Sequence, residues 1–208
     1  VALVPGANPA FGLNTLGGAI SLTTLDGRSA PGVRADVTLG SFARKRVDAS
    51  YGGSGSDGWH HYVAGTWFDE DGWRDESQGD LGLVLAKLGR SQGDTDWSLS
   101  LLGGRSTLIG NGLVPAYTIE EVDGEVETEP DLYASRRRAI YTHPDQTRNE
   151  LLQLTLNARH AVDAATELDL LAYVRSTERR TVNGDAADDE EAELPAARNT
   201  SRTEQTAS

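Results

Sequence analysis

The chain has 208 residues, of which 38% are apolar and 25% are charged, and its formal net charge is −13. This acidic balance argues against a duplex nucleic-acid binder and against electrostatic docking on an anionic membrane surface. Cysteine is absent, which excludes a disulfide framework and a thiolate metal site. No run of about 18 apolar residues occurs, which argues against a transmembrane helix, whereas the strands of a transmembrane β-barrel are short and only half apolar.

The two ends of the sequence predict a piece of a longer protein. It begins at Val1 with neither a methionine nor the basic and apolar segments of a signal peptide. It stops at Ser208, partway into another alternating segment. We therefore expect that the parent protein continues beyond both ends.

Alternation of apolar and polar residues begins at Val33 and predicts β-strands. Val33, Ala35 and Val37 share one face of the first segment, and Arg34 and Asp36 share the other. Seven strands are expected, near residues 33–42, 45–53, 59–69, 80–90, 95–105, 148–160 and 166–178. Strands of about ten residues suit a tilted bilayer crossing and exceed the usual length of about five or six in soluble proteins.

A helix over residues 148–175 is the main alternative to the last two strands. Glu150, Leu151, Leu154 and Ala158 could form one stripe of a helix, and residues 161–173 include several helix-forming types. Periodicity alone leaves both possibilities open.

The connections between the expected strands alternate in length after the first hairpin. Residues 53–58, 91–94 and 161–165 form short connections, whereas 70–79, 106–147 and 179–202 form longer ones. In an up-and-down barrel this order places every short turn at one rim and every long loop at the other. Outer-membrane barrels have that asymmetry, and a soluble β-sandwich has no physical reason for it.

Aromatic residues fall near the ends of the expected strands. They are Tyr51, Trp59, Tyr62, Trp67, Phe68, Trp73 and Trp97. Such positions predict aromatic girdles at the two membrane interfaces. The alternative is that these side chains are ordinary core aromatics.

The segment from Asn8 to Thr24, Asn-Pro-Ala-Phe-Gly-Leu-Asn-Thr-Leu-Gly-Gly-Ala-Ile-Ser-Leu-Thr-Thr, resembles the end of the plug of TonB-dependent outer-membrane receptors. In that family a Gly-Gly-Ala/Val-Ile-Asn/Ser-Ile/Leu-x-Thr-Lys element precedes the first barrel strand. Here Leu25 stands where the family has lysine. Residues 40–42, 69–75 and 141–147 are similar to later pieces of the family in the same order, so the resemblance covers nearly the whole chain.

The plug-end motif consists of Asn14, Gly17, Gly18, Ala19 and Ile20. The two glycines permit backbone conformations and close approaches that a Cβ would block. Residues 19–23 then alternate as a short strand. The resemblance implies that this strand belongs to the small sheet of a plug inside a barrel.

The fold that the resemblance implies is all-β: about seven strands of a transmembrane antiparallel barrel of about 22, preceded by the C-terminal end of a plug. Residues 1–32 would be the plug end and residues 33–208 the N-terminal part of the barrel. The parent would sit in the outer membrane of a Gram-negative bacterium, in contact with lipid.

The resemblance also implies energised transport without a cofactor. A substrate, with a ferric siderophore as the expected cargo, would bind extracellular loops and plug apices. The TonB complex would then pull the plug through a region that these residues do not include.

Few residues suggest a binding or catalytic site. Arg136, Arg137, Arg138 and Tyr141 lie in the longest loop, where cationic donors could hold an anionic ferric chelate. The alternative is a surface cluster that balances nearby glutamates. The histidine spacing predicts no metal site, and no nucleophile, base and acid set predicts an enzyme.

Two other function classes remain open at the sequence level. A passive porin is disfavoured by the plug-like residues 8–24. A soluble β-sheet adhesin or binding module is disfavoured by the strand lengths and by the alternation of loop lengths.

Overall fold

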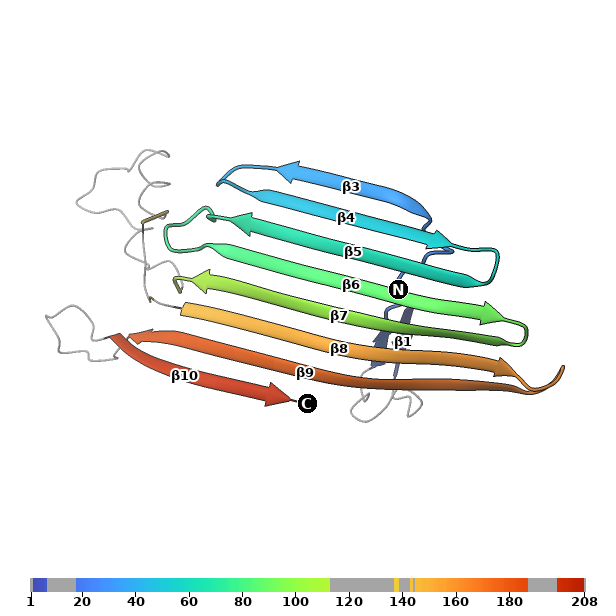
Figure 1. Cartoon of the computed structure of the whole chain (residues 1–208). Helices are drawn as coiled ribbons and strands as arrows, with labels where there is room; N and C mark the ends of the chain where they lie inside the picture. Colours follow the sequence, from blue (N-terminus) through green and yellow to red (C-terminus); the bar gives the residue numbers. More distant parts are fainter. Residues whose placement is uncertain are drawn as a thin grey trace, which may run out of the picture.

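The computed structural model describes residues 2–6, 18–112, 137–138, 143, 145–186 and 198–207. Apart from Arg137 and Arg138, whose backbone is helical, its regular elements are all β-strands. Eight of them form one antiparallel sheet in the order β10-β9-β8-β7-β6-β5-β4-β3, so every strand pairs with its neighbours in sequence (Figure 1). The all-β fold class is confirmed, and the helix alternative for residues 148–175 is wrong.

The strands of the large sheet lengthen from β3 to β9. They are β3 (Gly32–Leu39), β4 (Lys45–Ser54), β5 (Trp59–Glu70), β6 (Gly79–Gln92), β7 (Thr95–Gly110), β8 (Asp145–Ala161), β9 (Glu167–Ala186) and β10 (Arg198–Ala207). A separate two-stranded sheet consists of β1 (Ala2–Pro5) and β2 (Gly18–Ser21).

The first strand ends earlier than the alternation predicts. It stops at Leu39, not at residue 42, because Phe42 and Ala43 have left-handed backbone angles, with φ of 60° and 55°. The amide of Gly40 donates to the carbonyl of Arg44 over 2.9 Å and closes the turn. A turn of this kind reverses the chain within residues 40–44.

The later strands extend beyond their predicted ends. β7 continues to Gly110, and β8 already begins at Asp145. The prediction of a loop over residues 179–202 is wrong for most of these residues. β9 runs to Ala186, and an eighth strand begins at Arg198, which pairs with Ala186. Backbone pairing continues where the apolar alternation has stopped, since ladder hydrogen bonds do not require apolar side chains.

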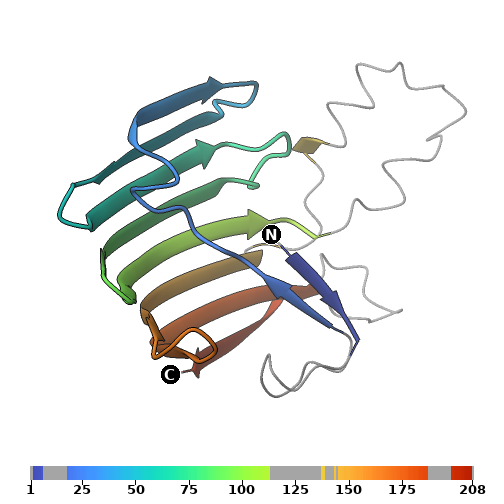
Figure 2. The same ribbon diagram turned by 90° about the vertical axis from the view of Figure 1, so that its right-hand side faces the viewer.

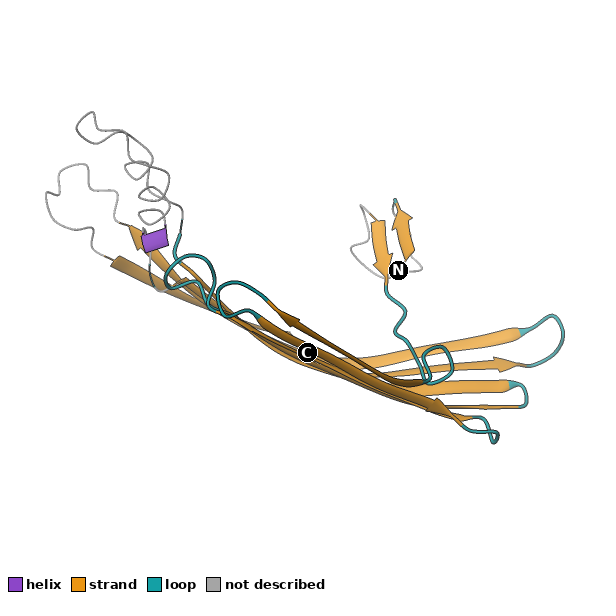
Figure 3. Ribbon diagram, turned by 90° about the horizontal axis from the view of Figure 1, so that it is seen from above, coloured by secondary structure: helices purple, strands orange, loops and turns teal. Residues whose placement is uncertain are grey.

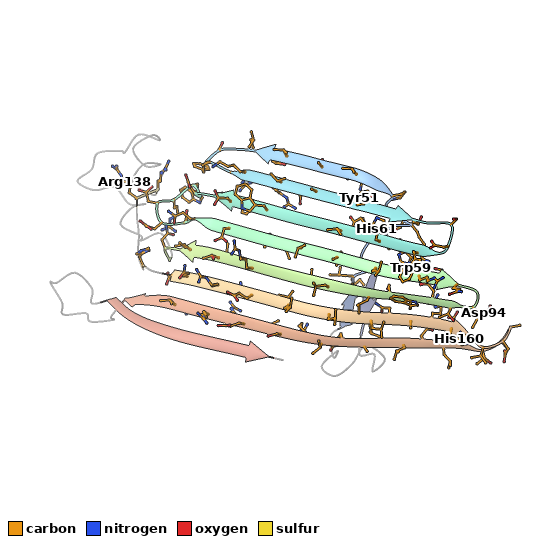
Figure 4. All side chains as sticks on the ribbon, in the orientation of Figure 1. Tyr51, Trp59, His61, Asp94, Arg138 and His160 are labelled. Atoms are coloured by element: carbon orange, nitrogen blue, oxygen red, sulfur yellow. The ribbon has the colours of Figure 1, made fainter. Side chains whose placement is uncertain are left out.

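The connections divide between the two ends of the sheet. Residues 55–58, 93–94 and 162–166 join strands at one end, which we call the short-turn edge. Residues 40–44, 71–78, 111–144 and 187–197 join strands at the other end, the long-loop edge. Figure 4 shows Trp59, Asp94 and His160 toward the short-turn edge and Arg138 at the long-loop edge. The predicted alternation of connection lengths is therefore present.

The small sheet lies on one face of the large sheet. Figures 2 and 3 show β1 and β2 standing away from that face, joined to β3 by residues 22–31. We call residues 22–31 the linker and the face it contacts the linker face. The large sheet itself begins at Gly32.

The described residues contain almost no apolar core. Tyr62, which is 5% exposed, is the only buried hydrophobic side chain among them. No helix in the described part of the chain has the length and apolar character to cross a membrane. The large sheet is a single layer whose two faces differ in chemistry.

Candidate functional site

The strand register gathers apolar side chains on the face opposite the linker, which we call the apolar face. Residues directly opposite in an antiparallel sheet point to the same side, and the pairs Val33–Tyr51, Tyr51–Val63, Val63–Ala86 and Ala86–Leu101 carry one row across the sheet. The large exposed side chains of this face are Val33, Val37, Leu39, Val47, Tyr51, Trp59, Val63, Trp67, Val84, Leu88, Leu99, Leu101, Leu152, Leu154, Leu168, Leu170 and Val174.

Charged residues border the apolar band at the long-loop edge. Asp69 and Asp80 are opposite one another there on β5 and β6, and Arg105 and Glu150 are opposite one another on β7 and β8. Between these borders and Arg90, the apolar face of the described strands β3–β9 carries no Asp, Glu, Lys or Arg. The band is therefore a continuous uncharged surface.

Aromatic side chains mark the short-turn edge of the apolar band. The rings of Trp59 and Trp97 meet edge to face with centroids 5.7 Å apart, and the Arg90 guanidinium lies 5.3 Å from the Trp59 ring. Tyr62 and Phe68 do not lie on this face, because the period of two turns them to the linker face.

The linker face is predominantly polar. Its side chains include Arg34, Asp36, Asp48, Ser50, Thr66, Lys87, Ser98, Ser100, Asn149, Gln153, Thr155, Asn157, Arg175 and Arg179. Exposed large apolar side chains on this face are Leu83, Leu108, Leu171 and Tyr173. The two faces of the sheet thus differ in the polarity of their side chains.

The linker contacts the sheet through its backbone. A Cβ built on Gly27 would overlap the carbonyl oxygens of Gly53 and His61, and one built on Gly52 would overlap the carbonyl oxygen of Ala30. Glycine is required at these positions because no side chain fits between the two backbones. The linker therefore lies directly on β4 and β5.

Arg28 clamps the linker to the short-turn edge of β6 and β7. Its Nη1 donates to Ser91 Oγ over 2.5 Å and to Asp96 Oδ2 over 2.6 Å. Ser91 Oγ also donates to Asp96 Oδ2 over 2.6 Å, so three polar groups form one closed network. The hydrogen bond that Arg28 donates to Asp96 raises the pKa of Arg28 above its ordinary value.

Asp26 shapes the linker so that Arg28 can reach this network. Its Oδ1 accepts hydrogen bonds from the amides of Arg28 and Ser29, over 3.0 and 2.8 Å, and its carbonyl accepts one from the amide of Ala30. Burial alone would raise the pKa of Asp26, but the hydrogen bonds from Ser29 and Arg28 outweigh it and hold that pKa well below its ordinary value. The carboxylate stays ionised at neutral pH and fixes a tight turn.

His60 lies beneath the linker and is 1% exposed. Neither ring nitrogen has a hydrogen-bond partner in the described structure. Gly89 on the neighbouring strand leaves the space that the ring occupies, since a Cβ there would overlap it. His60 thus packs as a buried ring under the docked linker.

Replacing Arg28 with alanine is expected to loosen the linker without unfolding the sheet. The change removes the hydrogen bonds that the guanidinium donates to Ser91, Asp96 and Asp26. Because the Arg28 and Asp96 side chains are each nearly half exposed, the attachment of the linker is expected to weaken by only about 1–2 kcal/mol. Hydrogen exchange of the amides in residues 24–31 of the full-length protein should rise several-fold. Arg34→Ala, which removes an exposed arginine from the same face without a bonded partner in the described structure, should leave that exchange unchanged; equal exchange in both variants would contradict the clamp.

Two of the four predicted substrate-binding residues, Arg137 and Arg138, are described, and they lie at the long-loop edge. Arg137 Nε lies 3.1 Å from Asp75 Oδ1, and its carbonyl accepts the amide of Asp75 over 3.0 Å. The Arg137 guanidinium also lies 5.9 Å from the Phe42 ring. Arg138 is exposed, and Arg136 and Tyr141 lie outside the described residues. Arg137 thus binds an acidic residue of another connection, and the glutamates of the surface-cluster interpretation lie outside the described residues.

The plug-end motif is partly described. Gly18, Ala19 and Ile20 lie in β2, and Gly18 has a φ of 132° that favours glycine. β2 pairs antiparallel with β1, with Ala19 opposite Val4 and Ile20 opposite Leu3. Asn14 and Gly17 lie outside the described residues. The expected short strand is therefore present, although it ends at Ser21 and not at residue 23.

Sequence reasoning missed the linker clamp and the buried histidine. Arg28 and Asp96 lie 68 residues apart, and no local pattern links them. Within the described residues, no group of three or more His, Asp or Glu side chains could hold a metal ion. No protein-family model matches the chain, and no curated protein matches it significantly.

Proposed function

We propose that this chain is part of a TonB-dependent outer-membrane receptor, containing the end of the plug and the first strands of the barrel. The observation that carries the proposal is the division of one sheet into an uncharged apolar face and a polar face that holds the linker. A strand in a transmembrane barrel needs this alternation, because one face meets lipid and the other meets the lumen.

The exposure of the apolar face supports lipid as its partner. Val33 is 80% exposed and Val174 is 66% exposed, at opposite sides of a band that crosses seven strands. Soluble monomers rarely expose apolar patches beyond a few hundred Å². The aromatic and charged residues at the two borders suit the interfaces between hydrocarbon and water.

The linker favours a plugged receptor over a passive porin. A porin lumen is an open aqueous channel. Here the linker lies on the polar face, where Gly27 and Arg28 attach it. β1 and β2, which precede the linker in the chain, lie on the same side of the large sheet. Such an attached N-terminal segment is what a barrel-filling plug requires.

The orientation follows from the connections. Short turns face the periplasm in outer-membrane barrels, and long loops face outward. β3 runs from the short-turn edge to the long-loop edge, so the linker would enter the barrel wall from the periplasmic end. The proposed cargo, a ferric siderophore, would then arrive at the long-loop edge, where Arg137 and Arg138 lie.

The function is tested by uptake of labelled ferric siderophores into cells with and without the receptor, each with and without TonB. Uptake should need both proteins, because a plugged barrel opens only when energy moves the plug. Uptake that needs the receptor but not TonB would indicate a porin-like channel. TonB-dependent uptake of cobalamin or a glycan, with no response to iron, would retain the receptor class and remove the siderophore.

Thiol labelling of the full-length protein on intact cells tests the orientation. A cysteine at Asp71, or at Glu125 in the longest connection, should react with an impermeant reagent, since both belong to the long-loop edge. Cysteines at Ser56, Asp94 and Asp163 in the short turns should stay unlabelled until the outer membrane is permeabilised. Labelling of the short turns alone would invert the orientation, and equal labelling of both sets would exclude the barrel.

A further inference from the structure

Two arginines on the linker face of β9 have no side-chain partner among the residues that the structure describes. The side chains of Arg175 and Arg179 make no ion pair or hydrogen bond with the described residues, and both side chains are exposed. Arg175 is directly opposite Gln153 of β8, and Arg179 is directly opposite Asn149. Each rung therefore places a guanidinium beside a side-chain amide on the same face.

Both amides donate a hydrogen bond to a hydroxyl group on the linker face. Gln153 Nε2 donates to Thr155 Oγ1 over 3.0 Å, and Asn149 Nδ2 donates to Ser106 Oγ over 3.2 Å. These bonds fix the amides within a wall of hydroxyl and amide groups on β7 and β8. Between Arg159 and the long-loop edge, Arg175 and Arg179 are the cationic side chains on the linker face of β8 and β9.

The described part of β6–β9 places no carboxylate beside the two arginines on the linker face. On the linker face of β6–β9, the acidic residues lie at the strand ends, beyond residues 98–108 of β7, 147–157 of β8 and 171–181 of β9. The chain as a whole has 32 acidic and 19 basic side chains. A surface with two arginines and no carboxylate among its described residues is therefore more positive than the chain as a whole. Elsewhere on the sheet, arginines pair with acids, as Arg46 does with Asp48 and Arg159 does with Asp169.

We propose that the linker face of β8 and β9 is a contact surface for an anionic cargo, with Arg175 and Arg179 as its charge-selecting residues. The inference rests on the proposed transport function and adds the charge of the cargo to it. Unpaired guanidinium groups bind carboxylate, catecholate or phosphate oxygens through charge-assisted hydrogen bonds, and the neighbouring amides and hydroxyls can accept and donate to the rest of such a ligand.

Transport by the full-length receptor tests the charge selection. The probes are ferric enterobactin, which is anionic, ferrichrome, which is neutral, and ferrioxamine B, which is cationic. In the Arg175→Gln/Arg179→Gln variant, uptake of the anionic chelate at low concentration should fall roughly tenfold relative to the other two, since each lost charged contact weakens binding. Arg175→Lys/Arg179→Lys should recover part of the loss. The matched control is Arg148→Gln, which removes an exposed arginine from the opposite face of β8.

A measurement without cargo separates this inference from the proposed function. Cysteine at Gln153 in the purified full-length receptor is treated with methanethiosulfonate reagents that carry either a sulfonate or a trimethylammonium group. With both arginines present, the ratio of anionic to cationic reaction rates should be on the order of fivefold higher than in the double glutamine variant. Cysteine at Leu152, the next residue on the apolar face, should react with neither reagent.

Three outcomes distinguish a failure of the inference from a failure of the proposed function. Equal reactivity at positions 152 and 153 would remove the barrel, and with it the proposed function. Reactivity at 153 alone, with no change in the rate ratio and no selective loss of anionic uptake, would overturn the inference and leave the function standing. If TonB drives uptake of none of the three chelates, the siderophore assignment fails, and the rate ratio at position 153 alone decides the inference.

Discussion

The isolated 208-residue chain is expected to aggregate in detergent-free buffer and to form its β-sheet only in detergent micelles or lipid. Tyr62 is the only buried hydrophobic side chain among the described residues, so water has access to nearly all apolar side chains of the sheet. β3 and β10 form the two edges of the sheet and present unpaired backbone groups that template association. A single-layer sheet with one apolar face has no interior that could offset the entropy of folding.

Size-exclusion chromatography and circular dichroism after dilution from urea measure this expectation. Dilution into buffer should give material in the void volume, whereas dilution into micelles should give dispersed particles with a β-sheet spectrum. A monodisperse monomer that melts cooperatively in plain buffer would contradict the expectation. That result would favour the soluble binding module over both barrel interpretations.

The period of two predicted most of this fold. Leu152, Leu154 and Leu156 alternate with polar residues, and this pattern gave the correct face of β8 despite the competing helical stripe. A helix would have placed Leu151, Leu154 and Ala158 together, but the extended strand places Leu151 on the linker face and Leu154 and Ala158 on the other. The pattern thus fixes both the strand and its orientation.

Strand ends were predicted less well because pairing and alternation stop at different places. Residues 179–186 of β9 include Arg179, Arg180 and Asp185 and have no apolar stripe, yet the backbone ladder with β10 runs through them. Phe42 and Ala43 had the opposite effect, since they continue an apolar segment but adopt left-handed turn angles. Side-chain patterns report which face is apolar, and backbone pairing sets where the strand ends.

The contacts of the linker could not be predicted from the sequence. Gly27 is required by the backbone atoms of Gly53 and His61, which come into range only after β4 and β5 have paired. The Arg28–Asp96 pair likewise depends on the tertiary register of the sheet. A glycine and an arginine in a loop have many possible uses, and only the folded sheet selects among them.

Leu101→Arg in the full-length protein is expected to destabilise the barrel by about 2–4 kcal/mol and to prevent most of it from assembling in the outer membrane. Leu101 lies near the middle of the apolar face, opposite Ala86 and Leu154, and is 42% exposed in the sheet. If that face meets water, an arginine there costs little, because it is already exposed. If that face meets hydrocarbon, the charge must be desolvated or must reach the distant interface. The two environments therefore predict opposite results for one substitution.

Ser100→Arg is the matched control, because Ser100 precedes Leu101 on β7 and points to the linker face. In the proposed barrel an arginine there would face the polar lumen, next to Thr155, and should lower the stability by no more than about 1 kcal/mol. Urea unfolding in micelles measures the stability of both variants, and the yield of heat-modifiable receptor in outer-membrane fractions measures their assembly. Loss of folded protein with Leu101→Arg but not with Ser100→Arg is the expected result, because the proposed barrel would have lipid and lumen on opposite sides of a single strand. Equal tolerance of both arginines would place the apolar face in water and remove lipid as its partner.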